Sequence, residues 1–176
     1  MARFDLIAAD ELIAERNSDQ AIACTNGCSW CCHQLIVMTN RSDGVALLDK
    51  ARATLSAQEF ASVETALREQ AAEIRSMSYE EAETRQWTCP FLRDELCTVY
   101  DARPVACRSV FSPDAGCCKA MMQADRFEDL TEYHQHLATE IGERAMALQF
   151  EINDRRPVTG AVEMRSLLVD LLDEHH

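Results

Sequence analysis

The stretch that decides the fold is Cys89–Arg108, CPFLRDELCTVYDARPVACR, in which three cysteines alternate with apolar and turn-forming residues. Two prolines interrupt it, and proline breaks both helices and central strands. We expect the residues on either side of Arg93–Glu95 to form a small hairpin, and Asp101 to cap a short turn that presents Cys107. The sequence therefore predicts an irregular, cysteine-rich loop here rather than a long helix.

A second cysteine-rich stretch, Cys24–His33, reads CTNGCSWCCH. Spacings of two or three residues let one loop or helical turn aim two thiolates at one metal ion. The adjacent pair Cys31 and Cys32 cannot easily point both side chains at one small ion. The pair therefore favours a polynuclear centre, either an iron–sulfur cluster or two metal ions, over a single zinc. A buried or outer-shell role for one of the two thiols stays open.

The chain has nine cysteines, confined to residues 24–32 and 89–118. An odd number of cysteines argues against a disulfide framework, and so does the reducing cytoplasm in which we expect the protein, for the reason given below. Metal ligation, redox chemistry and packing as small apolar residues remain, and the segregation favours a site. We leave Cys117 nearer to packing, and His33 nearer to an outer-shell or exposed role. The predicted metal ligands are Cys24, Cys28, Cys31, Cys32, Cys89, Cys97, Cys107 and Cys118.

The rest of the chain has the apolar spacing of helices. Ser42 or Asp43 is expected to cap one helix, and Ser56 with Glu59 forms a capping box that begins another. The other expected elements are a helix over residues 4–17, an extended run at 34–39, a capping box at 78–81 leading a helix that ends near 87, a long helix over 127–148, a break at 157–160 and a last helix over 164–171.

Composition fits this pattern. With 176 residues, 47% of them hydrophobic, the chain is long enough for one apolar core. Five glycines and four prolines are too few for a linker or a many-turned β fold. We predict a mostly α fold in which residues 1–176 form a single helical domain, with two irregular cysteine-rich loops, 24–33 and 89–118, forming a metal centre.

The charge of −13 excludes two classes of partner. An acidic surface repels phosphate backbones and anionic lipid, so neither nucleic acid nor a membrane is expected. The first residues carry acidic side chains where a signal peptide would be apolar, and a cytoplasmic location is expected. The expected partner is a metal ion, and no protein partner is indicated.

Basic residues gather among the cysteines of this otherwise acidic chain. They are Arg93, Arg103, Arg108 and Lys119. Several thiolates on one centre leave net negative charge, which guanidinium groups would offset. The alternative is that these side chains pair with Asp94, Asp101 or Asp114.

The two cysteine groups resemble the YkgJ-type cysteine-cluster family, also called the CxxCxxCC or zinc- or iron-chelating domain. The resemblance is carried by Cys31-Cys32, Cys89-Pro-Phe-Leu, Cys97-Thr-Val-Tyr, Arg103-Pro104 and Cys107-Arg108. Three residues separate Cys24 from Cys28, where the family has two. The resemblance implies metal chelation and leaves zinc and iron open. A more distant similarity is to flagellin lysine-N-methylase, which transfers methyl groups to protein lysines.

Three functions follow as hypotheses. The first is a metal-binding protein with a cysteine-ligated iron–sulfur, iron or zinc centre, whose loss would unfold the chain. The second is a metal- or iron–sulfur-dependent enzyme, related to lysine methylation or redox chemistry, with a pocket beside the cysteines. The third is a metal-free thiol redox sensor with low-pKa thiols. We favour the first.

Overall fold

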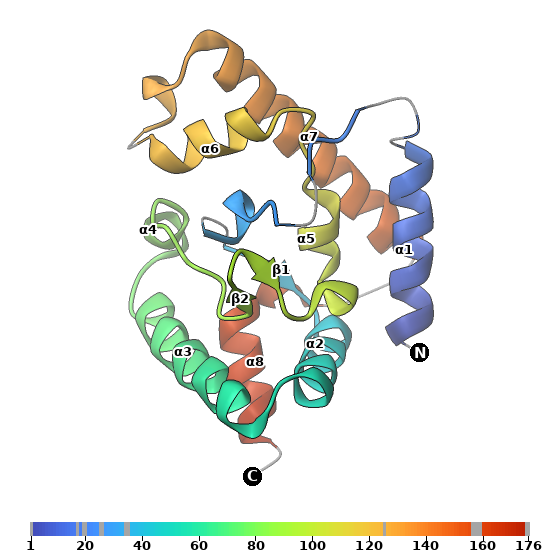
Figure 1. Ribbon diagram of the computed structural model, residues 1–176, viewed down its shortest axis with the longest axis vertical. Helices are drawn as coiled ribbons and strands as arrows, with labels where there is room; N and C mark the ends of the chain where they lie inside the picture. The colour runs from blue at the N-terminus through green and yellow to red at the C-terminus, as the bar shows by residue number, and fades with distance from the viewer. Residues whose placement is uncertain are drawn as a thin grey trace.

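Helices α2 (Arg41–Thr54), α3 (Ala57–Arg75) and α8 (Met164–Asp173) form the largest apolar core of the computed structural model. The structure describes residues 2–16, 18, 21–24, 27–33, 36–124, 126–155 and 160–174. The core brings together Leu47, Leu67 and Leu168, all 1% exposed or less. These residues come from the apolar faces that the helical spacing predicts. Figure 1 shows the C-terminal helix lying against both earlier ones.

Local side-chain signals begin several of the helices. Ser56 and Glu59 form the predicted capping box of α3, and Ser78 and Glu81 form the one that begins α4 (Tyr79–Glu83). Asn40, rather than Ser42 or Asp43, caps α2, because its side chain accepts the backbone N–H of Asp43 at 3.0 Å. Helix α4 ends at Glu83, four residues before the expected end.

A short antiparallel sheet joins the start of α2 to the start of α8. Strand β1 (Met38–Thr39) pairs with β4 (Val162–Glu163), and the backbone N–H of Met164 donates to Val37 O at 2.8 Å. Extended structure at 36–39 agrees with the expected run, of which residues 34 and 35 lie outside the described part. Strand β4 was not expected. The predicted break at 157–160 lies outside the described residues except for Gly160.

In Figure 1 a second group of helices lies above and beside this core. It comprises α1 (Ala2–Arg16), α5 (Val105–Ser109), α6 (Ala115–Gln123), η3 (Phe127–Asp129) and α7 (Glu132–Arg155). Helix α7 starts five residues later than expected, because Phe127 lies in the separate turn η3. Helix α6 begins after Asp114, whose side chain accepts the N–H of Gly116 at 2.7 Å, and it occupies sequence expected to be irregular.

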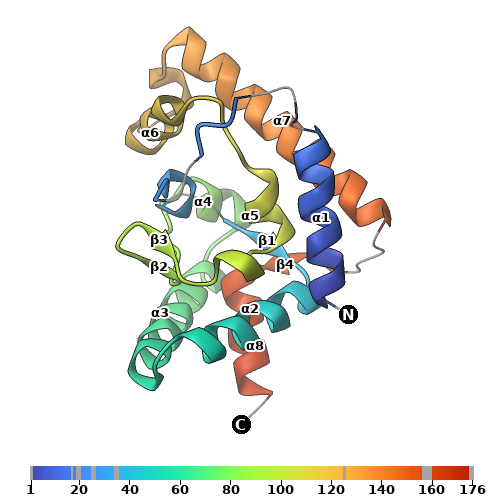
Figure 2. The ribbon, with the colours of Figure 1, turned by 45° about the vertical axis from the view of Figure 1, so that its right-hand side comes forward.

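The cysteine-rich segments lie between the two helix groups. Figures 1 and 2 both show the turn η1 (Trp30–His33) between α6 above and the hairpin of β2 (Leu92–Arg93) and β3 (Leu96–Cys97) below. The mostly α fold is therefore confirmed, with small antiparallel strand pairs. In the described part of the chain, no helix is long and apolar enough to cross a membrane.

Candidate metal centre

Hydrogen bonds hold the backbone of the first cysteine group in place at both ends. The backbone N–H of Ala23 donates to Ser112 O at 2.8 Å, and the N–H of Ser112 donates to Cys24 Sγ at 3.3 Å. Further on, the N–H of Cys32 donates to Ser29 O at 2.7 Å and closes the turn η1. This turn presents Cys31 and Cys32 together.

The second group begins with the hairpin. Phe91 is 1% exposed, and its carbonyl accepts both the N–H and the hydroxyl of Thr98, at 3.0 and 2.9 Å. Asp94 and Glu95 form the turn with positive φ values of 48° and 60°. Two residues with positive φ match the twist of a tight hairpin. The expected hairpin exists, with shorter strands than predicted, and it places Cys97 opposite Leu92.

Cys107 comes from the short helix α5. Asp101 does not cap it as expected, since it lies inside the turn η2 (Tyr100–Ala102), and Pro104 precedes α5 without a side-chain cap. Arg108 fixes this connection, because its guanidinium donates to Arg103 O at 2.6 Å and to Asp101 O. The buried arginine thus holds the loop between Cys97 and Cys107 in shape.

The two groups meet at the backbone. The N–H of Cys89 donates to the carbonyl oxygen of Cys32 at 2.7 Å. Cys89, Cys97 and Cys107 also pack against the core formed by α2, α3 and α8. The contact that the two separated cysteine groups were expected to make therefore exists.

Five thiols affect one another's ionisation and define an inner group. They are Cys31, Cys32, Cys89, Cys97 and Cys107. Burial raises the pKa of Cys89 to about 11. Burial also raises the pKa of Cys107, and the neighbouring thiolates of Cys89 and Cys31 raise it further. Ionising one of these thiols makes it harder to ionise the next, unless a cation is present.

The adjacent thiols of Cys31 and Cys32 differ in pKa. A hydrogen bond from the thiol of Cys32 lowers the pKa of Cys31 to about 7, and the same bond raises the pKa of Cys32. Cys31 is therefore the first thiolate that the inner group offers near neutral pH. A thiolate is the form that binds metal or attacks a disulfide.

Arg103 supplies positive charge to this group. Burial raises the pKa of Cys97, and the charge of Arg103 opposes this rise. Arg103 also acts to lower the pKa values of Cys31 and Cys107. Its guanidinium lies 3.5 Å from the centre of the Tyr100 ring. The prediction that arginines offset thiolate charge therefore holds for Arg103.

The other basic residues of the cysteine segments have other partners. Arg93 pairs with Glu59 and Arg108 with Asp10, rather than with the nearby aspartates that were the alternative. The ammonium of Lys119 lies 5.8 Å from the centre of the Trp30 ring.

Three further thiols form an outer group near Ser112, comprising Cys24, Cys28 and Cys118. Burial raises the pKa of Cys118 to about 11, a hydrogen bond with Ser112 opposes this, and Cys24 and Cys28 add to it. Cys118 reaches this group from α6, whose next residue back, Cys117, is 0% exposed and packs against Leu137 and Ile141 of α7. Cys117 therefore packs between α6 and α7.

All nine cysteines are free thiols. Among the residues that the structure describes, no three Cys, His, Asp or Glu side chains are arranged so that they could hold a metal ion. The inner thiols share one region without enclosing a common point. The chemical type of these ligands still fits a metal centre, because thiolates are the preferred ligands of zinc and of iron–sulfur clusters.

His33 lies beside the inner group and turns toward the hairpin. Its Nε2 is 3.2 Å from Glu95 Oε2 and its Nδ1 is 3.4 Å from Thr88 Oγ1. The hydroxyl of Ser29 also donates to Glu95. A cavity of about 400 Å³ opens here, lined by Gly27, Ser29, Trp30, His33, Glu95 and Met122. The sequence analysis placed Glu95 in the hairpin turn, but its contacts with His33 and Ser29 could be found only from the folded structure.

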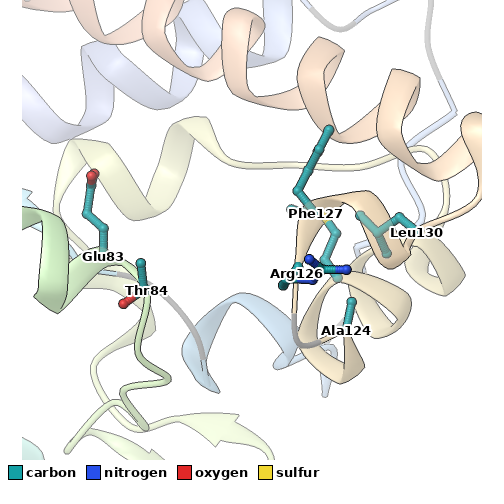
Figure 3. Close-up of a pocket in the computed structure, with 7 residues that line it drawn as sticks. Glu83, Thr84, Ala124, Arg126, Phe127 and Leu130 are labelled. Carbon is teal, nitrogen blue, oxygen red and sulfur yellow. The ribbon is translucent and has the colours of Figure 1, made fainter.

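A second cavity, of about 490 Å³, lies between α4 and the end of α6 (Figure 3). It is lined by Glu83, Thr84, Met121, Ala124, Arg126, Phe127 and Leu130. Its lining is mixed and includes no thiol, so it is separate from the cysteine groups.

Thiols gathered from two distant segments define a cysteine-cluster protein of the metal-binding class. Over residues 23–115, just over half of its length, the chain matches the CxxCxxCC family, described as "Putative zinc- or iron-chelating domain", and it belongs to that family. Cys118 lies just outside the matched segment. No curated protein and no solved structure shows significant similarity to the chain, so the likeness to flagellin lysine-N-methylase gains no support.

Proposed function

We propose that the protein holds a zinc or iron centre, in one domain, on its inner thiols. The observation that carries this is the meeting of the two cysteine groups, where Cys89 N–H binds Cys32 O at 2.7 Å beside the mutually interacting thiols. Partly buried thiols that raise one another's pKa are unstable as a set of anions and are stabilised by a cation. Membership of a zinc- or iron-chelating family supports the same assignment.

The number of thiols favours a polynuclear centre. A structural zinc site takes four ligands, whereas Cys31, Cys32, Cys89, Cys97 and Cys107 already number five. The outer thiols Cys24, Cys28 and Cys118 complete the set of eight proposed ligands. An iron–sulfur cluster or two metal ions uses such a set better than one zinc ion does.

The first experiment is anaerobic purification followed by elemental analysis, acid-labile sulfide determination and a visible absorption spectrum. Iron with sulfide in a coloured protein would establish a cluster. Stoichiometric zinc in a colourless protein would establish a structural centre, and removing it with a chelator should lower the melting temperature. A protein with neither metal, which binds neither when reconstituted anaerobically, would overturn the proposal.

A second candidate function is an enzyme whose metal centre acts on a small ligand. The cavity of about 400 Å³ lined by Trp30, His33 and Glu95 favours it, because it adjoins the turn that carries Cys31 and Cys32. Titrating the metal-loaded protein with S-adenosylmethionine tests one version of this idea. A change in the spectrum of the centre would support it, and an unchanged spectrum would count against methyl transfer.

The proposed setting is a reducing, cytoplasmic one with the metal ion as the partner. Nine free thiols and a charge of −13 suit such a setting and suit neither nucleic acid nor an anionic membrane. The metal-free redox sensor remains the competing account of Cys31, whose pKa is lowered to about 7 by its bond with Cys32. It predicts a reversible disulfide in metal-free protein.

A further inference from the structure

Arg165 is a charged residue in an apolar place. It is the second residue of α8, and it is 1% exposed, as buried as the leucines around it. Burying a guanidinium is costly unless it is paired and hydrogen-bonded. A residue kept in such a position has a structural or functional task, and its partners indicate which.

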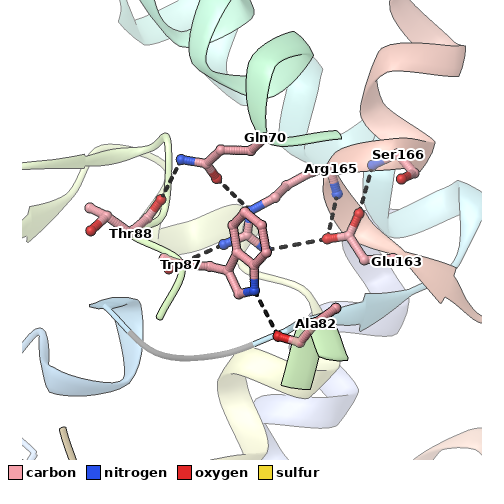
Figure 4. Close-up of polar contacts among 7 residues, drawn as sticks. All are labelled: Gln70, Ala82, Trp87, Thr88, Glu163, Arg165 and Ser166. Carbon is pink, nitrogen blue, oxygen red and sulfur yellow. Dashed lines mark hydrogen bonds and ion pairs between the residues drawn. The ribbon is translucent and has the colours of Figure 1, made fainter. Parts of the chain in front are cut away.

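The guanidinium contacts three separate parts of the chain (Figure 4). Its Nε donates to Gln70 Oε1 of α3 at 2.6 Å, its Nη1 to Glu163 Oε1 at 3.2 Å, and its Nη2 to the carbonyl oxygen of Trp87 at 3.2 Å. Its central carbon lies 5.9 Å from the centre of the Trp87 ring. Glu163 is itself held as the cap of α8, accepting the backbone N–H groups of Arg165 and Ser166. The arginine is thus fixed by Glu163 and Gln70, and its guanidinium reaches the backbone of the segment that leads into the cysteine loop.

Gln70 binds the backbone carbonyl of the residue that follows Trp87. While its Oε1 accepts from Arg165, its Nε2 donates to the carbonyl oxygen of Thr88 at 2.9 Å. Two consecutive carbonyls, those of Trp87 and Thr88, are therefore held by two interlocked side chains. The next residue is Cys89, whose own N–H is bound to Cys32 O. The backbone leading to Cys89 has little freedom left.

Through its bond to Trp87 O, the guanidinium of Arg165 also brings positive charge to the segment that leads into Cys89. A cation behind a buried thiolate also compensates charge when that thiolate binds a metal.

We propose that Arg165 is a positioning residue of the thiolate centre, which together with Gln70 aims Cys89 at the metal. This inference rests on the proposed function, because it takes Cys89 as a ligand. It assigns a role to a residue fifty positions beyond the end of the segment that matches the family. Outer-shell partners that orient a ligand typically contribute about 10- to 100-fold to metal affinity.

The test compares Co²⁺ binding by the full-length metal-free protein and its variants, followed by thiolate-to-cobalt absorption. Arg165→Met removes the guanidinium at similar volume. Gln70→Leu removes the bond to Thr88 O and the bond from Arg165 Nε, while leaving the guanidinium in place. Arg165→Lys keeps the charge without the three-way hydrogen bonding. Arg75→Met is the matched control, because Arg75 also ties α3 to α8, through Ser166 O at 2.9 Å and Asp170 at 2.7 Å, without reaching the cysteine loop.

We expect Arg165→Met to bind Co²⁺ about 10- to 100-fold more weakly, with reduced thiolate absorption per bound ion, and Gln70→Leu to change both in the same direction. Arg75→Met should lower the melting temperature and leave the cobalt spectrum unchanged. If Arg165→Met does not fold, Gln70→Leu decides alone. Unchanged affinity and absorption in Gln70→Leu, or full affinity in Arg165→Lys, would overturn the positioning role. Failure of the unmodified protein to bind Co²⁺ and Zn²⁺, and also iron on anaerobic reconstitution, would instead overturn the proposed function.

Discussion

The backbone N–H of Cys89 and the carbonyl oxygen of Cys32 form a hydrogen bond of 2.7 Å between residues fifty-seven positions apart. This bond joins the turn η1 to the loop that enters the hairpin. It does not depend on either thiol, so the backbone brings the two cysteine groups together without using a sulfur atom. The thiols of both residues remain available to a ligand.

The first prediction separates a ligand from a packing thiol. Loss of an outer-shell partner typically lowers metal affinity about 10- to 100-fold. Cys31→Ser should lower it at least as much, because it removes the most readily ionised thiol of the inner group. Metal content after anaerobic reconstitution and a melting curve measure this. Full metal content and unchanged stability would remove Cys31 from the centre.

Cys117→Ala is the matched cysteine control. Cys117 is 0% exposed, packs against Leu137 and Ile141, and its thiol lies 3.6 Å from His134 O. Losing the sulfur should cost about 1 kcal/mol of unfolding free energy and no metal. Metal loss in this variant would show that Cys117 belongs to the centre.

Local signals in the sequence predicted the parts of the fold that depend on neighbours along the chain. The capping boxes of Ser56 and Ser78 and the hairpin turn at Asp94–Glu95 are complete within a few residues, so their patterns could be recognised directly. The helix at α2 was predicted but its start was wrong. Strand β1 ends at Thr39 because it pairs with β4, and this distant contact makes Asn40 the cap.

The contacts that shape the site come from outside the cysteine segments. Helix α4 was expected to continue to Trp87, but the Trp87 indole N–H donates to Ala82 O at 2.8 Å and its carbonyl is held by Arg165. Likewise, the sequence favoured packing for Cys117 and ligation for Cys118, but the contact behind that difference appears only in the fold, where α6 buries Cys117 against α7. Such choices are made by tertiary packing, which no local pattern contains.

The second prediction concerns Arg108, which holds the loop between Cys97 and Cys107. Its side chain is 4% exposed, donates to Arg103 O and Asp101 O, and pairs with Asp10. Arg108→Gln should cost roughly 2–4 kcal/mol, because two carbonyls lose a charged donor. Urea unfolding measures this, and metal content should fall with it.

Asp10→Asn is the comparison for Arg108. The side chain of Asp10 is 56% exposed, so its loss should cost under about 1 kcal/mol and leave metal content unchanged. Equal losses in the two variants would show that the ion pair, rather than the bonds to the loop carbonyls, is what matters.

The third prediction is that His33→Ala keeps its metal. Both ring nitrogens of His33 lie near other side chains, Nε2 at 3.2 Å from Glu95 and Nδ1 at 3.4 Å from Thr88. We expect full metal content, a stability loss of about 1 kcal/mol or less, and faster amide hydrogen exchange in the hairpin. Glu95→Gln should have the same effect on the hairpin. If His33→Ala loses metal while Glu95→Gln keeps it, the imidazole is a ligand.

The fourth prediction is a pH dependence of stability that disappears when metal binds. Burial raises the pKa of Cys89 from 9.0 to about 11, so the folded metal-free protein keeps a proton that the unfolded chain releases earlier. Its stability from this group is fully present below pH 9 and is lost as pH rises through about 11. Cys31 contributes to stability with the opposite sign, because its pKa is lowered to about 7, but only between that value and 9.0.

Urea unfolding of protein stripped of metal with a chelator should therefore show falling stability above pH 9. The stability of the Cys89→Ala variant should decline less steeply over the same interval. Zinc-loaded protein should not show this loss, because the metal holds the thiolate form. A rise in the stability of the metal-free protein over the same interval would contradict the burial of Cys89.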